Sequence, residues 1–146
     1  MTVKTFILAL STLLLVACAA PSKTTATMPD DLQVALTGYL QAGDANDATT
    51  LDRYMHDDFR VALYDAKADA VKVLDRATYR MMIDTKKFGG YPRTAEVQSV
   101  NRIGENMATL QTVLTSPGKP SLKNFYSLAK VGGEWKMIQD FVVLIP

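Results

Sequence analysis

The hydrophobic period changes once along this chain, and that change constrains the fold more than any other feature. Between Met28 and Phe88, apolar residues recur mainly at three- and four-residue steps, as they do on one face of a helix. From Thr94 to Leu144 they recur at every second residue, as in a half-buried strand. Helices followed by strands are typical of an α+β domain, in which the helices cover one face of an antiparallel sheet.

Three helices are expected in the first half of the chain. The first spans residues 28–43, starts with carboxylates after Pro29 and ends at Gly43. The second spans about residues 47–56 and can be capped by Asp47. The third begins at a cap on Asp75 and ends at the Gly89-Gly90 pair. Its inward face is expected to carry Ala77, Met81, Met82 and Phe88.

The other expected elements are segments of the length of a strand. Four of them, 94–101, 107–115, 122–131 and 134–144, are joined by short turns rich in Gly and Pro, which predicts an antiparallel meander. Two more short strands, 59–64 and 70–74, flank a polar turn. The expected fold is therefore α+β, with three N-terminal helices packed on a strongly curved antiparallel sheet of four to six strands.

Composition excludes several classes of function. The chain has 146 residues, which is enough for one domain. Its 16 basic and 15 acidic residues nearly cancel, so it lacks the excess positive charge that binding to nucleic acid requires. One Cys and one His leave no internal disulfide and too few ligands for a transition metal. We expect no nucleic acid partner, no metal and no cofactor.

The first 17 residues have the pattern of a leader. Lys4 precedes the apolar run 6–16, which is shorter than the roughly 20 residues that span a bilayer. The run ends in Leu15-Val16-Ala17-Cys18, which resembles a bacterial lipobox and implies cleavage before a lipidated Cys18. An ordinary signal peptide with an incidental Cys is the alternative. We expect a leader over 1–17, Cys18 and a flexible tether over 18–28, and one domain over 29–146.

The lipobox also predicts where the protein resides. Lipid chains on Cys18 would anchor the mature chain to a membrane without help from its near-zero charge. Ala19 follows the Cys, and in Gram-negative lipoproteins this resembles the signal for transfer to the outer membrane. The expected location is the cell envelope, at the outer membrane facing the periplasm.

Three stretches carry a resemblance that covers nearly the whole mature chain. Residues 39–44 (YLQAGD), 54–59 (YMHDDF) and 128–137 (LAKVGGEWKM) occur in an order and spacing similar to the nuclear transport factor 2 superfamily, and most similar to its putative lumazine-binding branch. The resemblance implies a cone of bent sheet around helices, with a pocket inside. It also implies a homodimer formed through the outer face of the sheet.

The resemblance also raises the question of catalysis. In ketosteroid isomerases of this superfamily, a carboxylate abstracts a proton next to a carbonyl, and a Tyr and a protonated Asp hold the oxyanion. At the matching positions this chain has Leu36, Leu63 and Asn124, none of which can transfer a proton. The unmodified isomerase mechanism is therefore excluded, although a displaced acid such as Asp58 or Asp140 could replace it.

Candidate ligand contacts are Tyr, Met and amide side chains. Tyr and Met at helical spacing are most often ordinary core, but buried Tyr hydroxyls need a polar partner, which a ligand can supply. The resemblance puts Trp135 on the packed side of the last strand, and by alternation Gln139 would then lie on the pocket side. The candidates are Tyr39, Tyr54, Tyr79, Met82, Asn124, Tyr126 and Gln139. The stretch His56-Asp57-Asp58 is interpreted as a charged surface rather than a site, because consecutive residues point in different directions.

Three functional hypotheses result. The leading one is a lipid-anchored envelope protein whose cone binds a small, largely apolar or aromatic ligand without catalysis. The second is an enzyme of the polyketide-cyclase or isomerase type that uses a displaced carboxylate. The third is a structural or interaction lipoprotein whose cone is filled by its own side chains. Catalysis is the less favoured interpretation.

Overall fold

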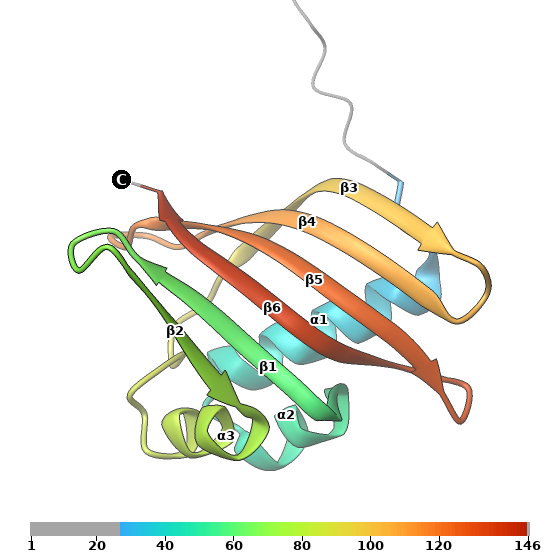
Figure 1. The fold of residues 1–146 in the computed structure, drawn as a ribbon, viewed down its shortest axis with the longest axis horizontal. Coiled ribbons are helices and arrows are strands. Elements are labelled where there is room, and N and C mark those ends of the chain that lie inside the picture. The colour runs from blue at the N-terminus through green and yellow to red at the C-terminus, as the bar shows by residue number, and fades with distance from the viewer. Residues whose placement is uncertain (1–26, 146) are drawn as a thin grey trace, which may run out of the picture.

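A computed structural model describes residues 27–145 and confirms an α+β fold (Figure 1). The leader, Cys18 and the tether up to residue 26 lie outside the described residues. No helix within residues 27–145 is long and apolar enough to cross a membrane. The elements in chain order are α1 (Asp30–Asp44), α2 (Ala48–Tyr54), β1 (Met55–Asp65), β2 (Ala70–Asp75), α3 (Arg76–Asp84), β3 (Thr94–Ile103), β4 (Met107–Thr115), β5 (Ser121–Val131) and β6 (Glu134–Ile145).

The six strands form one curved sheet in the order β2-β1-β6-β5-β4-β3. The predicted meander from β3 to β6 is present, with every neighbouring pair antiparallel. The prediction of a purely antiparallel sheet was wrong, because β1 pairs with β6 in parallel. Tight turns indicate that two strands adjacent in sequence pair with each other and are antiparallel. β1 and β6 are separated by most of the domain, so no local pattern sets their relative direction.

Local signals place the starts of α2 and α3 where the sequence predicts them, whereas the predicted end of the third helix at Gly89-Gly90 was wrong, because α3 ends at Asp84. The Asp47 carboxylate accepts the backbone N–H of Thr50 at 2.9 Å, and the Asp75 carboxylate accepts that of Thr78 at 2.8 Å. These bonds satisfy amides that would otherwise lack a partner in the first turns of α2 and α3.

The predicted inward face of α3 was partly wrong. The buried residues of α3 are Tyr79 and Ile83, whereas Ala77 and Met81 are exposed and Met82 is half-buried. The reason is that α3 has only nine residues and contacts the rest of the domain along the single row that Tyr79 and Ile83 form at four-residue spacing.

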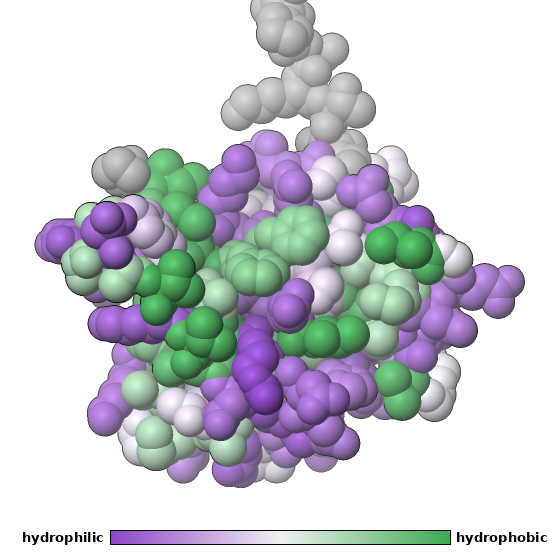
Figure 2. Space-filling view, viewed as in Figure 1, coloured by the Kyte–Doolittle hydropathy of each residue, from purple (hydrophilic) through white to green (hydrophobic). Residues whose placement is uncertain are grey.

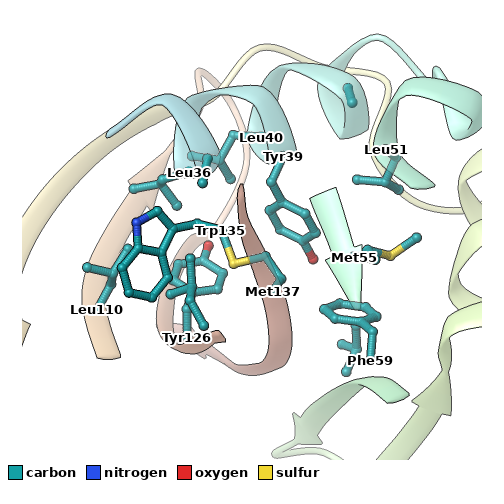
Figure 3. Close-up of a cluster of buried hydrophobic side chains, with 14 of the residues drawn as sticks. Leu36, Tyr39, Leu40, Leu51, Met55, Phe59, Leu110, Tyr126, Trp135 and Met137 are labelled. Carbon is teal, nitrogen blue, oxygen red and sulfur yellow. The ribbon is translucent and has the colours of Figure 1, made fainter. Parts of the chain in front are cut away.

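The core lies between α1 and the concave face of the sheet (Figure 3). Tyr39 of α1 is its centre, with its ring centroid 6.0 Å from those of Phe59 and Tyr126 and 6.5 Å from that of Tyr79. Trp135 is buried at the other end of α1, which confirms its place on the packed side. The helix is therefore fixed to the sheet mainly by aromatic contacts, which bury a large area per side chain.

A bulge in β6 decides which of its side chains face inward. Ser127 of β5 pairs with Gln139, but the next residue, Leu128, pairs with Met137, so one residue of β6 is extra. Trp135 and Met137 face the core before the bulge, and Asp140 and Val142 face it afterwards. The expectation that Gln139 faces the pocket was wrong, because the extra residue moves it to the outer face, where it is exposed.

The start of α1 is held to the sheet by one carboxylate. Asp31 accepts hydrogen bonds from Trp135 Nε1 at 2.8 Å, Arg102 Nη2 at 2.6 Å and Lys130 Nζ at 3.4 Å. Both cations also lie over the indole ring, each 5.6 Å from its centroid. We call this group, Asp31, Arg102, Lys130 and Trp135, the Asp31 clamp. It closes one end of the cone.

Candidate functional site

The opposite end of the cone contains a cavity of about 250 Å³. It opens between α3, the segment that follows α3, and the inner faces of β1, β5 and β6. The cone is therefore only partly filled by its own core. The wall is mainly apolar and aromatic, with three polar side chains, and consists of Val61, Leu63, Tyr79, Phe88, Tyr91, Arg93, Leu122, Asn124, Asp140, Val142 and Leu144.

Asp140 forms the polar floor of this cavity and is 4% exposed. Its Oδ2 accepts a hydrogen bond from the Tyr39 hydroxyl at 3.0 Å, and its Oδ1 accepts one from Asn124 Nδ2 at 2.7 Å. Burial raises the pKa of Asp140 to about 6, although both hydrogen bonds and the charge of Arg93 act in the opposite direction. The group can therefore gain or lose a proton near neutral pH.

Arg93 lies at the edge of the cavity, but its hydrogen bonds are made to α1 and not to groups of the cavity floor. Its Nε donates to the Asp44 carboxylate, its backbone N–H donates to Asp44 Oδ2 at 3.0 Å, and its Nη2 donates to the Leu40 carbonyl at 3.1 Å. The end of α1 thus fixes the segment after α3, and Asp44 balances most of the guanidinium charge. No cation of the described part of the chain is bonded to Asp140 in this way.

Several buried polar atoms near this floor have no hydrogen-bond partner among residues 27–145. They include Asn124 Oδ1, the Tyr126 hydroxyl and Thr112 Oγ1. Asn124 and Thr112 are paired across β4 and β5, and Tyr126 is two residues further along β5, on the same inner face. Burial also raises the pKa of Tyr79 to about 12, so its hydroxyl keeps its proton. The floor is thus rich in polar groups that the protein leaves partly unsatisfied.

The structure brings together only part of the predicted site. Tyr79 and Asn124 line the cavity, while Tyr39 and Tyr126 are fully buried next to it. Tyr54 lies elsewhere, because its ring covers Gly38 on the outer side of α1. Met82 and Gln139 do not line the cavity either.

Sequence reasoning missed Arg93 and considered Asp140 only as a displaced acid. The signal for Asp140 is that it is the one charged residue in the apolar stretch 137–145. Of the two acids considered, the Asp58 side chain is 83% exposed, so it cannot act inside the cone. Leu36 is core, and Leu63 lines the cavity one strand away from Asp140.

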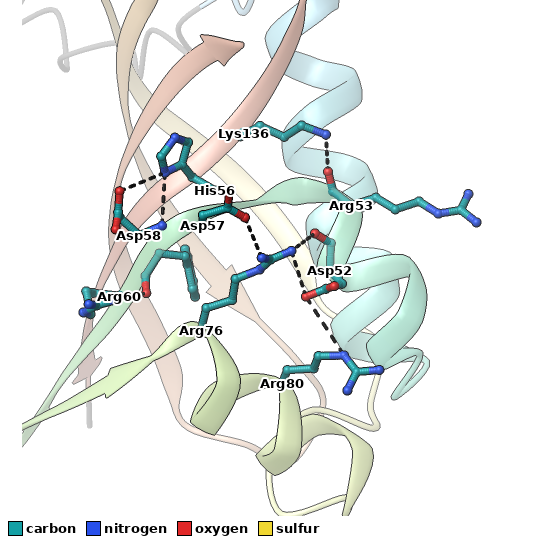
Figure 4. A network of polar contacts seen from close by, with 10 residues as sticks. Asp52, Arg53, His56, Asp57, Asp58, Arg60, Arg76, Arg80 and Lys136 are labelled. Atoms are coloured by element: carbon teal, nitrogen blue, oxygen red, sulfur yellow. Dashed lines mark hydrogen bonds and ion pairs between the residues drawn. The ribbon is translucent and has the colours of Figure 1, made fainter. Parts of the chain in front are cut away.

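A second polar cluster lies on the surface where α2, β1 and α3 meet (Figure 4). Arg76 contacts Asp57 at 2.7 Å and Asp52 at 3.1 Å, and His56 Nδ1 accepts the backbone N–H of Asp58 at 3.1 Å. The carboxylates of Asp52 and Asp57 are solvated and paired with Arg76. Within residues 27–145, no three His, Cys, Asp or Glu side chains are grouped as metal ligands. The cluster serves as a link between three elements.

The outer face of the sheet carries apolar side chains in the part formed by β2, β1, β6 and β5 (Figure 2). Val71 and Val73 of β2 are 61% and 63% exposed, and Phe141 and Val143 of β6 are 42% and 44% exposed. Phe125 lies beside Phe141, with ring centroids 6.1 Å apart. We call these five residues the outer apolar patch.

Comparisons with known proteins agree with this fold. A family model described as putative lumazine-binding matches residues 29–141. An NTF2-like protein of unknown function from Shewanella baltica superposes with a TM-score of 0.68 at 17% identity, over 80% of this chain and 92% of that one. No curated protein matches the sequence.

Two further solved structures have the same fold. A cystatin-like fold protein from Burkholderia xenovorans has a TM-score of 0.64 at 19% identity, over 79% of this chain and 89% of that one. A ketosteroid isomerase-like protein from Erwinia carotovora atroseptica has a TM-score of 0.62 at 15% identity, over 80% and 95%. Identities this low support the fold alone.

Proposed function

We propose that this chain, which belongs to the putative lumazine-binding family, binds a small, largely apolar or aromatic molecule inside its cone. The observation that carries the proposal is the cavity of about 250 Å³ that has an apolar wall and a buried Asp140–Asn124 pair as its floor. Small-molecule sites have this composition, a hydrophobic lining with a few polar groups that fix orientation.

The size of the cavity limits the ligand. Pockets for drug-sized molecules occupy about 300–1,000 Å³, and this cavity is slightly smaller, at about 250 Å³. A ligand of one or two rings fits that range. Tyr79, Phe88 and Tyr91 supply aromatic surface against such rings.

Native mass spectrometry tests this proposal. The full chain is produced in a bacterial host, extracted in a mild detergent, and compared with Val142→Phe, which fills the cavity. The matched control is Val34→Phe, since Val34 is 66% exposed on α1, away from the cavity. We expect an extra mass on the wild type and on Val34→Phe that Val142→Phe lacks. An extra mass on all three proteins would place the ligand elsewhere, and bare protein after incubation with aromatic compounds would contradict binding.

We also propose that the domain is anchored through Cys18 in the cell envelope, at the outer membrane facing the periplasm. The support is the lipobox-like stretch Leu15-Val16-Ala17-Cys18 followed by Ala19. Labelling with a radioactive fatty acid tests it. The wild type should incorporate the label and sediment with outer membranes, and Cys18→Ser should do neither. Equal labelling of both proteins would contradict the anchor.

We also propose a homodimer formed through the outer apolar patch. Soluble proteins rarely leave several large apolar side chains exposed side by side unless another surface covers them. Phe141→Lys places a charge at the centre of the patch. Light scattering should show a dimer for the wild type and a monomer for Phe141→Lys, and a monomeric wild type would contradict the interface.

One observation favours a second function, proton transfer by an enzyme of the isomerase type. Asp140 is buried beside the cavity and its pKa of about 6 suits a general base or acid. A cyclic β,γ-unsaturated ketone, followed by NMR in deuterated water, tests this. An enzyme would exchange the protons next to the carbonyl, and Asp140→Asn would abolish the exchange. A wild type no faster than buffer would exclude this function for that substrate class.

A further inference from the structure

The floor of the cavity has more hydrogen-bond acceptors than the protein uses. Each oxygen of the Asp140 carboxylate accepts one hydrogen bond, although a carboxylate oxygen can accept two. Asn124 Oδ1 is buried and accepts none from residues 27–145. Leaving buried acceptor capacity unused is costly, so the Asp140 carboxylate, which lines the cavity, favours a partner that brings donors.

The two side-chain donors in contact with Asp140 are already bonded to it. The Tyr39 hydroxyl and Asn124 Nδ2 both donate to Asp140. Arg93 donates from its Nε and backbone N–H to Asp44 and from its Nη2 to the Leu40 carbonyl, all away from the floor. The Asp140 carboxylate thus keeps unused acceptor capacity after it has bonded to both neighbouring donors.

We infer that the ligand of the cone presents a hydrogen-bond donor, such as the N–H of an aromatic heterocycle, to Asp140, with apolar rings against the rest of the wall. This inference rests on the proposed binding function and adds the chemical class of the ligand. A molecule of the same shape that carries only acceptors would leave the same atoms unpaired and would also remove water from the carboxylate.

The two kinds of molecule should change the protonation of Asp140 in opposite directions. A donor stabilises the charged carboxylate and lowers its pKa, whereas an apolar ring without a donor desolvates it and raises the pKa. The Asp140 pKa of about 6 without a ligand leaves room for a measurable change in either direction.

Indole and benzofuran provide a matched test, because they share a shape and differ in an N–H against an oxygen. Binding to the full-length wild type is measured by NMR from the Leu122 and Leu144 methyl signals, with partition into detergent measured in a protein-free blank. The Asp140 carboxyl carbon is titrated with and without each compound. At a pH above 7 we expect indole to bind about tenfold more tightly than benzofuran, as for a hydrogen bond to a charged group.

Each outcome has a distinct meaning. Tighter binding of indole, with a lower Asp140 pKa in its complex and a higher one with benzofuran, supports the inference. Equal binding, or tighter binding of benzofuran, overturns it and leaves the cone as a binding site. No binding of either compound overturns it together with the proposed function.

Two Asp→Asn variants show which carboxylate causes the preference for indole over benzofuran. Asp140→Asn removes the carboxylate and should abolish the preference for indole, whereas Asp31→Asn, at the far end of the cone, should keep it. A preference that survives Asp140→Asn unchanged would show that the donor binds elsewhere and would also overturn the inference. The comparison of indole with benzofuran on the wild type does not depend on the folding of either variant.

Discussion

Two carboxylates, one at each end of the cone, have opposite environments. Asp31 is partly exposed, and its pKa is lowered, mainly by the hydrogen bond from Trp135 and also by Lys130 and Arg102. Asp140 is buried, its hydrogen-bond donors among residues 27–145 are the neutral groups of Tyr39 and Asn124, and burial raises its pKa to about 6. The same chemical group thus has a pKa below its usual value at one end and a pKa of about 6 at the other.

The two carboxylates differ in how far the protein satisfies them. A carboxylate with its own cations is satisfied by the protein, so the Asp31 clamp needs nothing further to be stable. A carboxylate buried beside a cavity with spare acceptor capacity is not satisfied by the protein alone. Perturbed titration in a concave site is a common property of binding and catalytic residues.

The largest expected difference between the two ends of the cone is the free energy of unfolding that a core side chain contributes at each. Leu128→Ala removes a fully buried side chain from the filled part of the core and should lower the free energy of unfolding by about 4 kcal/mol. Leu122→Ala only enlarges a cavity that already exists and should lower it by less than about 1 kcal/mol. Urea unfolding of both variants measures this. Equal losses would show that the open end is packed as tightly as the closed one.

Next in size is the effect of pH through Asp140. Its folded pKa of about 6 exceeds the unfolded value of about 3.9, so the folded state binds the extra proton between these values. That stabilisation is complete below about pH 4 and is lost as pH rises through 6, on the order of 3 kcal/mol in total. Wild type and Asp140→Asn are unfolded in urea from pH 4 to 8. A difference between them that does not change with pH would refute the buried titration.

Asp31 should show the opposite and smaller dependence. Its pKa is lowered on folding, so its contribution to stability is present above the unfolded pKa and is lost as pH falls through the folded pKa. Asp31→Asn should therefore be less stable than the wild type at neutral pH and equal to it in strong acid. Acid titrations followed by circular dichroism measure the gap, and a gap that widens on acidification would contradict the clamp.

The smallest effect is expected from Arg102→Gln. Arg102 and Asp31 form a partly exposed pair, and such pairs contribute little because water and salt screen them. Lys130 also remains over Trp135 in this variant. We expect a slight loss of stability at low salt that disappears at high salt, measured by thermal unfolding. A large loss independent of salt would mean that the Arg102 side chain acts through packing.

The features predicted from the sequence are local ones. Asp47 and Asp75 cap the second and third helices as expected, and the glycines at 132 and 133, both with positive φ, form the turn between β5 and β6. Such signals depend on a few consecutive residues, so periodicity and turn chemistry are sufficient to find them.

The features that escaped prediction depend on residues far apart in sequence. The parallel pairing of β1 with β6 and the bond between Asp44 and Arg93 leave no local pattern. The bulge in β6 had the largest consequence for the site, because one extra residue turned Gln139 outward and Asp140 into the cone. Alternation along a strand predicts a face only while its register is unbroken.

The position of β6 also determines when the cone can form. Although it comes last among the described strands, it lies between β1 and β5 in the middle of the sheet. When the chain emerges from its N-terminal end, β1 and β2 can form their hairpin early, but they cannot join the meander until β6 has emerged. Until then the inner faces of both halves are open to water and to chaperones. The floor around Asp140 is therefore one of the last parts of the molecule to take shape.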